Sequence, residues 1–190
     1  MEFLTQLWLP ILVSGVVVWI ASFIAWMVIG HHKKDRDPIP GGGERAFMET
    51  ITRMNIGPGN YGFPDFCQHD QLPRKERMEA MKELYDRRPM GVLRVWGEMN
   101  MGVNMLVTFL FYLVTSTMIG YLTWAALGRG ASPGKIFQIA GTAGILAYCF
   151  ATFPHDIWFQ KKRRAMLMDW ADGIVFGMIT AAVFAWWWPK

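Results

Sequence analysis

Four long apolar stretches alternate with polar segments along this chain of 190 residues. The apolar stretches cover residues 3–30, 101–127, 136–153 and 170–189. A helix needs about 20 consecutive apolar residues to cross the hydrocarbon core of a bilayer, and three of the four stretches reach that length. The pattern therefore predicts an all-α integral membrane protein with four transmembrane helices.

The polar segments divide the chain into regions. We expect a first transmembrane helix at 1–30, a cytoplasmic loop region at 31–100, and transmembrane helices 2–4 within 101–190. Apolar residues at helical spacing predict short helices over 44–55 and 73–88 of the loop region. Residues 90–96 are predicted to form a short strand or an extended segment. We therefore expect a compact cap on one face of the membrane, in place of a flexible linker.

Basic residues between the apolar stretches set the orientation that we expect. On the side of the loop region they are Lys33, Lys34, Arg36 and residues 161–164. On the opposite side they are Arg129, Lys135 and Lys190. Cytoplasmic flanks of membrane helices carry an excess of lysine and arginine, so the loop region is expected inside and both termini outside. The chain has a net charge of +4, and we expect its basic residues beside the spans to contact lipid headgroups. No nucleic-acid partner is expected.

Small residues recur at about four-residue spacing in the last two apolar stretches. Gly173, Gly177 and Ala181 form one such ridge, and Ala140 and Gly144 form another. Helices in lipid associate through close packing, which small residues permit. The ridges are expected to pack within the bundle or against another subunit.

Ionisable residues avoid the middle of every predicted span, which argues against a transporter or a proton pump. They gather at the cytoplasmic ends instead. The candidate metal ligands there are His31, His32, His155, Asp156, Asp169 and Asp172. Imidazole and carboxylate groups bind divalent metals, and a carboxylate can orient a ligating histidine. The alternative is that Asp169 and Asp172 accept hydrogen bonds from free amides at a helix N-terminus, while Asp156 pairs with nearby arginines.

A second group of potential ligands lies in the loop region. It consists of Asp65, Cys67, His69 and Asp70, whose short spacing could allow a small metal site. No second group of matching type follows it, as a zinc motif would require. Cys67 and Cys149 lie in different regions, so a disulfide is not expected. Apart from a divalent metal, no cofactor is expected.

Several short motifs are spread over the whole chain. They are Trp8-Leu9-Pro10-Ile11-Leu12 with Ser14, Phe63-Pro64, Met101-Gly102, Ile157-Trp158, Asp169, Asp172-Gly173, Gly177, Thr180-Ala181 and Trp188-Pro189. Through these motifs the chain resembles a group of small bacterial four-helix inner-membrane proteins without an established activity, although segment 65–90 departs from the pattern. The resemblance implies the architecture and a bacterial inner-membrane location, and it implies no mechanism.

These features favour a non-catalytic function. We expect an accessory or assembly subunit of a larger inner-membrane complex, whose partners are the lipid bilayer and other membrane protein subunits. The alternative is a metal-dependent membrane enzyme or redox protein that uses the His/Asp cluster at the cytoplasmic interface.

Overall fold

The computed structural model describes residues 2–65, 71–86 and 89–190. The chain forms two compact units. The first, here called the helical unit, combines Met1–Asp37 with Asn100–Lys190. The second, the inserted unit, is Pro38–Met99. The inserted unit therefore occupies most of the predicted loop region.

Four helices of the helical unit are long and apolar enough to cross a membrane. Their bounds are Glu2–Ile29, Met101–Leu127, Pro133–Trp158 and Arg163–Trp186. The first consists of α1 (Glu2–Phe23) and a π-helical turn (Ile24–Ile29), and the second is α4 (Met101–Leu127). The third consists of α5 (Pro133–Ile145), a π-helical turn (Leu146–Phe150) and α6 (Phe153–Trp158), and the fourth is α7 (Arg163–Trp186). Four helices long and apolar enough to cross a membrane are what the hydropathy pattern predicts.

The third helix extends beyond its apolar stretch at both ends, whereas the fourth begins before its stretch and ends at Trp186. Pro133 opens α5 at a first-turn position, where its missing N–H leaves no hydrogen bond unmade. Beyond the π-helical turn the third helix breaks, and α6 restarts with Pro154 in its own first turn. The fourth helix begins at Arg163, several residues before the apolar stretch, because its first two turns carry charged side chains that hydropathy does not detect.

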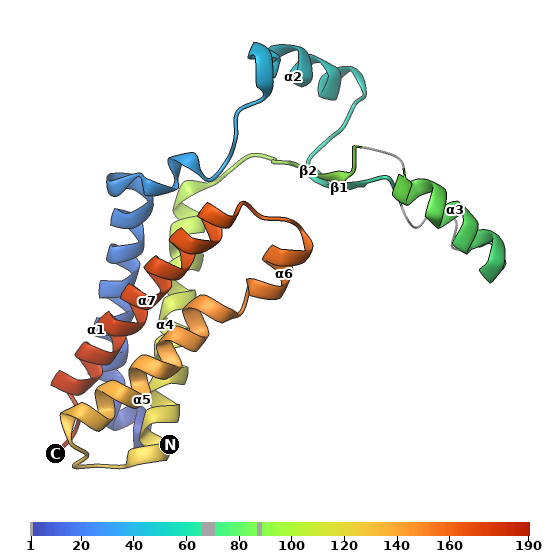
Figure 1. Cartoon of the computed structure of the whole chain (residues 1–190). Helices are drawn as coiled ribbons and strands as arrows, with labels where there is room; N and C mark the ends of the chain where they lie inside the picture. Colours follow the sequence, from blue (N-terminus) through green and yellow to red (C-terminus); the bar gives the residue numbers. More distant parts are fainter. Residues whose placement is uncertain (1, 66–70, 87–88) are drawn as a thin grey trace. The chain divides into compact units, whose positions relative to one another are not determined.

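Both termini of the helical unit lie at one end of the bundle, together with the connection between α4 and α5 (Figure 1). Arg129 Nη2 donates to Glu2 Oε1 at 2.6 Å, and Trp188 Nε1 donates to the Gly128 carbonyl at 2.9 Å. The chain thus crosses the bundle an even number of times. The segments that follow α1 and precede α7 meet at the opposite end, here called the polar end.

The two small-residue ridges pack against each other within the chain. A Cβ on Gly144 would lie 2.8 Å from Cα of Gly177, and a Cβ on Gly177 would lie 2.9 Å from the Ile145 nitrogen. A Cβ on Gly173 would lie 2.6 Å from Cys149 Sγ, and Ala140 and Ala181 are fully buried. The α5 and α7 backbones therefore approach closely, as small residues allow in helix pairs.

Hydroxyl and indole groups join α1 to α4. Ser116 Oγ donates to the Ile11 carbonyl at 3.1 Å and also contacts Ser14 Oγ. Trp19 Nε1 donates to the Met105 carbonyl at 3.2 Å. Six threonines of the spans bond carbonyls four residues earlier in their own helices: they are Thr108, Thr115, Thr117, Thr123, Thr142 and Thr180. Ser116 thus provides an interhelical bond that the hydropathy pattern does not reveal.

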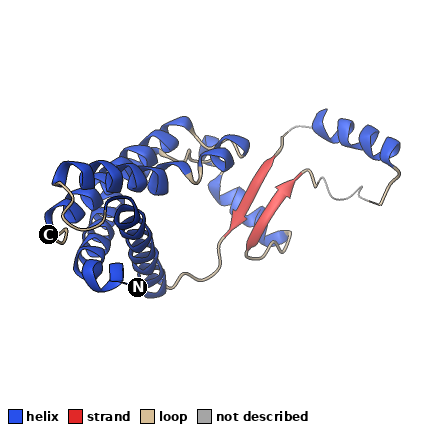
Figure 2. Ribbon diagram, turned by 90° about the horizontal axis from the view of Figure 1, so that it is seen from below, coloured by secondary structure: helices blue, strands red, loops and turns tan. Residues whose placement is uncertain are grey.

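The inserted unit contains two helices and a small sheet. Its elements are a 3₁₀ turn (Pro40–Gly42), α2 (Glu44–Arg53), β1 (Gly59–Phe63), α3 (Arg74–Asp86) and β2 (Gly91–Val95). The strands are antiparallel, with Tyr61 opposite Leu93 (Figure 2). Both predicted helices are present, and the extended segment near residue 90 is a strand. Among its described residues, only Leu84 is buried.

The contact between Gly144 and Gly177 gives a test of the packing of α5 on α7. We expect Gly144→Ala to lower the free energy of unfolding by about 1–3 kcal/mol, because the added methyl group must push two backbones apart. Gly134→Ala in the same helix is the control, since nothing lies within 4 Å of a Cβ there. Thermal unfolding in detergent, followed by circular dichroism, measures both. Equal stability of the two variants would contradict the packing.

Candidate functional site

A left-handed glycine ends the first spanning helix. Gly30 has φ +65°, a conformation that glycine adopts without steric cost and that commonly terminates helices. The chain then enters a 3₁₀ turn, His31–Lys34. Residues of this turn contact α7 at the polar end. Two adjacent histidines are thereby brought against the second and third turns of α7.

Asp172 of α7 contacts both histidines. His31 Nε2 lies 3.1 Å from Asp172 Oδ1, and His32 Nε2 lies 3.0 Å from Asp172 Oδ2. The second ring nitrogen of His32, Nδ1, lies 2.5 Å from Asp35 Oδ2. The Trp26 ring stacks on the His32 ring, with centroids 3.9 Å apart and planes 8° from parallel. His32 is thus fixed on both edges by carboxylates and on one face by an indole.

This histidine is among the most enclosed ionisable groups of the chain. The His32 side chain is 4% exposed, and that of Asp172 is 15% exposed. Burial lowers the pKa of His32, but hydrogen bonds with Asp172 and Asp35, and the attraction of both carboxylates, outweigh it. The pKa of His32 therefore lies above its ordinary value.

Two cations hold the remaining carboxylates in place. Arg164 Nη1 donates to Asp35 Oδ1 at 2.6 Å, and its Nη2 donates to the His31 carbonyl at 2.8 Å. Lys161 Nζ donates to Asp169 Oδ2 at 2.5 Å and to Asp156 Oδ2 at 3.2 Å. Burial lowers the pKa of Lys161, but its two carboxylate partners raise that pKa by more than burial lowers it, so the net shift is upward.

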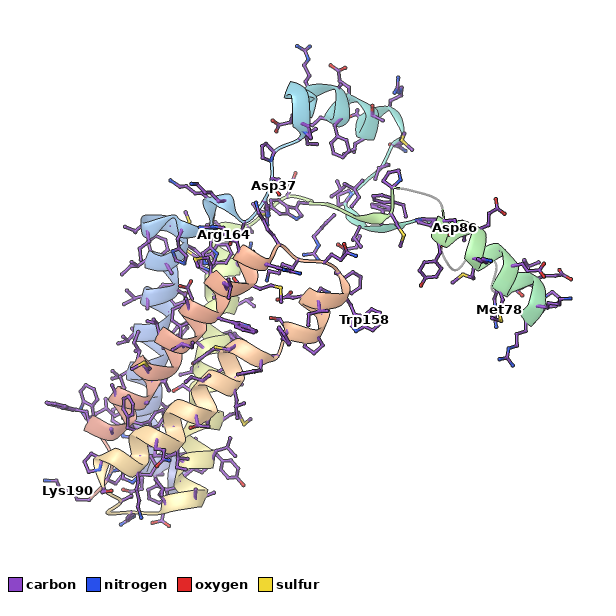
Figure 3. The ribbon with its side chains drawn as sticks, viewed as in Figure 1. Asp37, Met78, Asp86, Trp158, Arg164 and Lys190 are labelled. Carbon is purple, nitrogen blue, oxygen red and sulfur yellow. The ribbon has the colours of Figure 1, made fainter. Side chains whose placement is uncertain are left out.

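We call the group His31, His32, Asp35, Lys161, Arg164, Asp169 and Asp172 the polar cluster. Arg164 and Asp37 lie at the polar end, opposite the end that carries Lys190 (Figure 3). Lys162 adds an exposed contact there, with its Nζ 2.5 Å from Asp37 Oδ1. The cluster ties the segment after α1 to the first turns of α7.

Four of the candidate metal ligands predicted from sequence come together in the polar cluster: His31, His32, Asp169 and Asp172. Asp156 joins them indirectly, through Lys161. The His155 side chain is 64% exposed and lies 3.8 Å from Asp156, outside both ligand groups found among the described residues. Sequence reasoning missed Asp35, although its position three residues after His32 is a usable signal for a helical contact.

The helix-capping interpretation of Asp169 and Asp172 is wrong. Because α7 begins at Arg163, these residues lie beyond its first turn, where no free amides remain. Asp156 was expected to pair with arginines, but its cationic partner is Lys161. Asp169 and Asp172 therefore make contacts within the polar cluster, and Asp156 contacts it through Lys161.

Two sets of side chains within the described residues are close enough to hold a metal ion. The first is His31, His32 and Asp172, and the second is His32, Asp35 and Asp169. In each set the ligand atoms lie within 4.8 Å of one another. Asp65 is exposed, and its proposed companions Cys67, His69 and Asp70 lie outside the described residues.

No protein-family model, curated protein or solved structure matches this chain.

Proposed function

We propose that this multi-pass protein is a non-catalytic accessory or assembly subunit of a larger complex in the bacterial inner membrane. The observation that carries the proposal is the exposed apolar surface of the inserted unit. Four of its methionines are more than half exposed: Met48, Met54, Met78 and Met99. Flexible thioether side chains fill irregular surfaces and are frequent at protein-binding sites. A partner protein would remove this surface from water.

The small core of the inserted unit supports the same proposal. Leu84 is its one buried apolar side chain within the described residues. Hydrophobic stabilisation grows with the apolar area removed from water, so this unit gains little from its own packing. Covering its apolar side chains by a second protein would supply the missing burial.

The charges of α2 favour a protein partner over the lipid surface. The helix carries both signs, from Glu44, Arg45, Glu49 and Arg53, and Arg45 Nε donates to Glu49 Oε1 at 3.0 Å. Helices that lie on anionic membranes are rich in lysine and arginine on the polar face. The apolar stripe of α2, formed by Phe47, Met48 and Ile51, is therefore proposed to contact protein.

A single charge on this stripe tests the proposal. We expect Phe47→Asp to weaken the complex by about tenfold or more, because it places a carboxylate in an apolar contact. Ala46→Asp adds a carboxylate at an exposed position on the other side of α2 and should leave the complex intact. The full chain is solubilised from its native membranes in mild detergent, and the complex is measured by native electrophoresis and identification of its subunits.

A discrete complex with another integral membrane protein, lost in Phe47→Asp and kept in Ala46→Asp, is the expected result. If the wild-type chain runs alone after mild solubilisation, or if both variants keep the complex equally, the proposed role is wrong.

The proposed orientation puts both termini in the periplasm and the inserted unit in the cytoplasm. It rests on the basic residues beside the polar end, including Lys33, Lys34 and Arg163. The resemblance to bacterial inner-membrane proteins supports that membrane as the location.

Reporter fusions test this orientation. Alkaline phosphatase fused after Lys190 should be active, and the same enzyme inserted at Gly57 should be inactive, because the enzyme needs the oxidising periplasm for its disulfides. Activity at Gly57 together with inactivity at Lys190 would reverse the orientation.

The polar cluster favours a second candidate function, a metal-dependent membrane enzyme or redox protein. Metal centres of this kind use histidine and carboxylate side chains as ligands, and a further carboxylate commonly orients a ligating histidine ring. Metal content and visible absorption of the purified protein separate this candidate from a purely structural subunit.

A further inference from the structure

Three nitrogen and oxygen donors converge between the 3₁₀ turn and α7. They are Nε2 of His31, Nε2 of His32 and the carboxylate of Asp172. We propose that these three residues bind a divalent first-row transition metal, with Zn²⁺ as the ion that best fits them. The proposal depends on the local geometry alone, and it holds whether the protein is an accessory subunit or an enzyme.

The separations of the donor atoms suit such an ion. Zinc binds imidazole nitrogen and carboxylate oxygen at about 2.0–2.2 Å, so tetrahedral ligand atoms lie about 3.4 Å from one another. His32 Nε2 lies 3.0 Å from Asp172 Oδ2 and His31 Nε2 lies 3.1 Å from Asp172 Oδ1, so each nitrogen faces a different oxygen of one carboxylate. The nitrogen–nitrogen separation is within 4.8 Å. His31 is one-fifth exposed and can rotate to close this last distance, whereas His32 is held by its neighbours.

A carboxylate beside the ring already orients His32. Its Nδ1 lies 2.5 Å from Asp35 Oδ2, so a neutral ring that keeps its proton on Nδ1 would offer Nε2, on the Asp172 side, to a metal ion. Ligating histidines almost always donate their other N–H to a carboxylate or carbonyl in this way. Arg164 fixes Asp35 in turn and also holds the His31 carbonyl. The contacts of Arg164 with Asp35 and of Asp35 with His32 therefore orient one proposed ligand, the His32 ring, before an ion binds.

The charge balance of the polar end also favours a divalent cation. Four carboxylates gather here: Asp35, Asp156, Asp169 and Asp172. Lys161 and Arg164 are the permanent cations that contact them. The two histidines are the remaining partners of Asp172, and a divalent cation bound by neutral imidazoles would neutralise that carboxylate.

The alternative ligand set is less suitable. It would use His32 Nδ1 with Asp35 Oδ2 and Asp169 Oδ1, and both carboxylates are already paired through their other oxygens, with Arg164 and Lys161 respectively. Asp172 has only the two histidines as contacts of this kind within the described part of the chain. The metal is therefore assigned to the His31, His32 and Asp172 set.

Zinc binding by the purified full chain tests the proposal. The protein in mild detergent is stripped with a chelator, titrated with Zn²⁺ against a chromophoric competitor, and analysed for bound metal by mass spectrometry. One zinc ion per chain is expected for the wild type. His31→Gln and Asp172→Asn should lower the affinity by about 100-fold, and Asp35→Asn by about 10–100-fold, the usual effect of losing an outer-shell partner.

His155→Ala is the matched control, because it removes an exposed histidine outside the set. It should bind zinc as the wild type does. His31→Gln changes a partly exposed side chain, so its fold can be verified by circular dichroism and gel filtration before titration. Replacement with Co²⁺ should give visible d–d absorption in the wild type and in His155→Ala, and none in His31→Gln or Asp172→Asn.

Absence of zinc binding by the folded wild type at micromolar metal would overturn the assignment. Equal affinities in wild type, His31→Gln and Asp172→Asn would overturn it as well, because the ion would then lie elsewhere. Neither result depends on a partner protein, so failure here is distinguishable from failure of the proposed accessory role.

Discussion

Charged side chains that cannot enter hydrocarbon need partners where the helices end. In this protein the ion pairs of the polar cluster provide those partners at the polar end. Arg164 contacts Asp35 and the His31 carbonyl, and Asp172 contacts both histidines. These contacts fix the segment after α1 against α7, two elements that are distant in sequence. The direction of α1 and the start of α7 both depend on that connection. Ion pairs that are partly removed from water need such mutual partners, since a lone buried charge is strongly destabilising.

The rest of the bundle follows a different rule. Between its ends the helices have no charges to pair, so they associate through close backbone approach at Gly144 and Gly177 and through the hydroxyl bonds of Ser116. Apolar side chains facing lipid gain nothing from being buried against another helix, which leaves packing and a few polar contacts to select the arrangement. The bundle is thus specified by small residues in its middle and by charged residues at its end.

Much of this architecture could be predicted from the sequence, because hydropathy and small-residue spacing are local signals. The four spans, the ridges at Gly144 and Gly177, and the gathering of His31, His32 and Asp172 at one end all follow from them. The start of α7 at Arg163 lies before the apolar stretch, because the charges of Arg163 and Arg164 lower the hydropathy of that part of the helix. Asp35 and Lys161 were missed as cluster members, since their partners Arg164 and Asp169 become neighbours only when the helices pack. Which side chains pair depends on the rotation of each helix about its axis, and a sequence pattern alone does not report that rotation.

A double-mutant cycle on Arg164 and Asp35 tests the central connection most directly. The free energy of unfolding is measured in detergent for Arg164→Met, Asp35→Asn and the double variant, with Arg163→Met as an exposed neighbouring control. The account predicts a coupling energy of about 1–2 kcal/mol between Arg164 and Asp35, and little effect of Arg163→Met. Additive effects within about 0.3–0.5 kcal/mol would show that the two side chains do not hold α1 to α7, and would contradict the account.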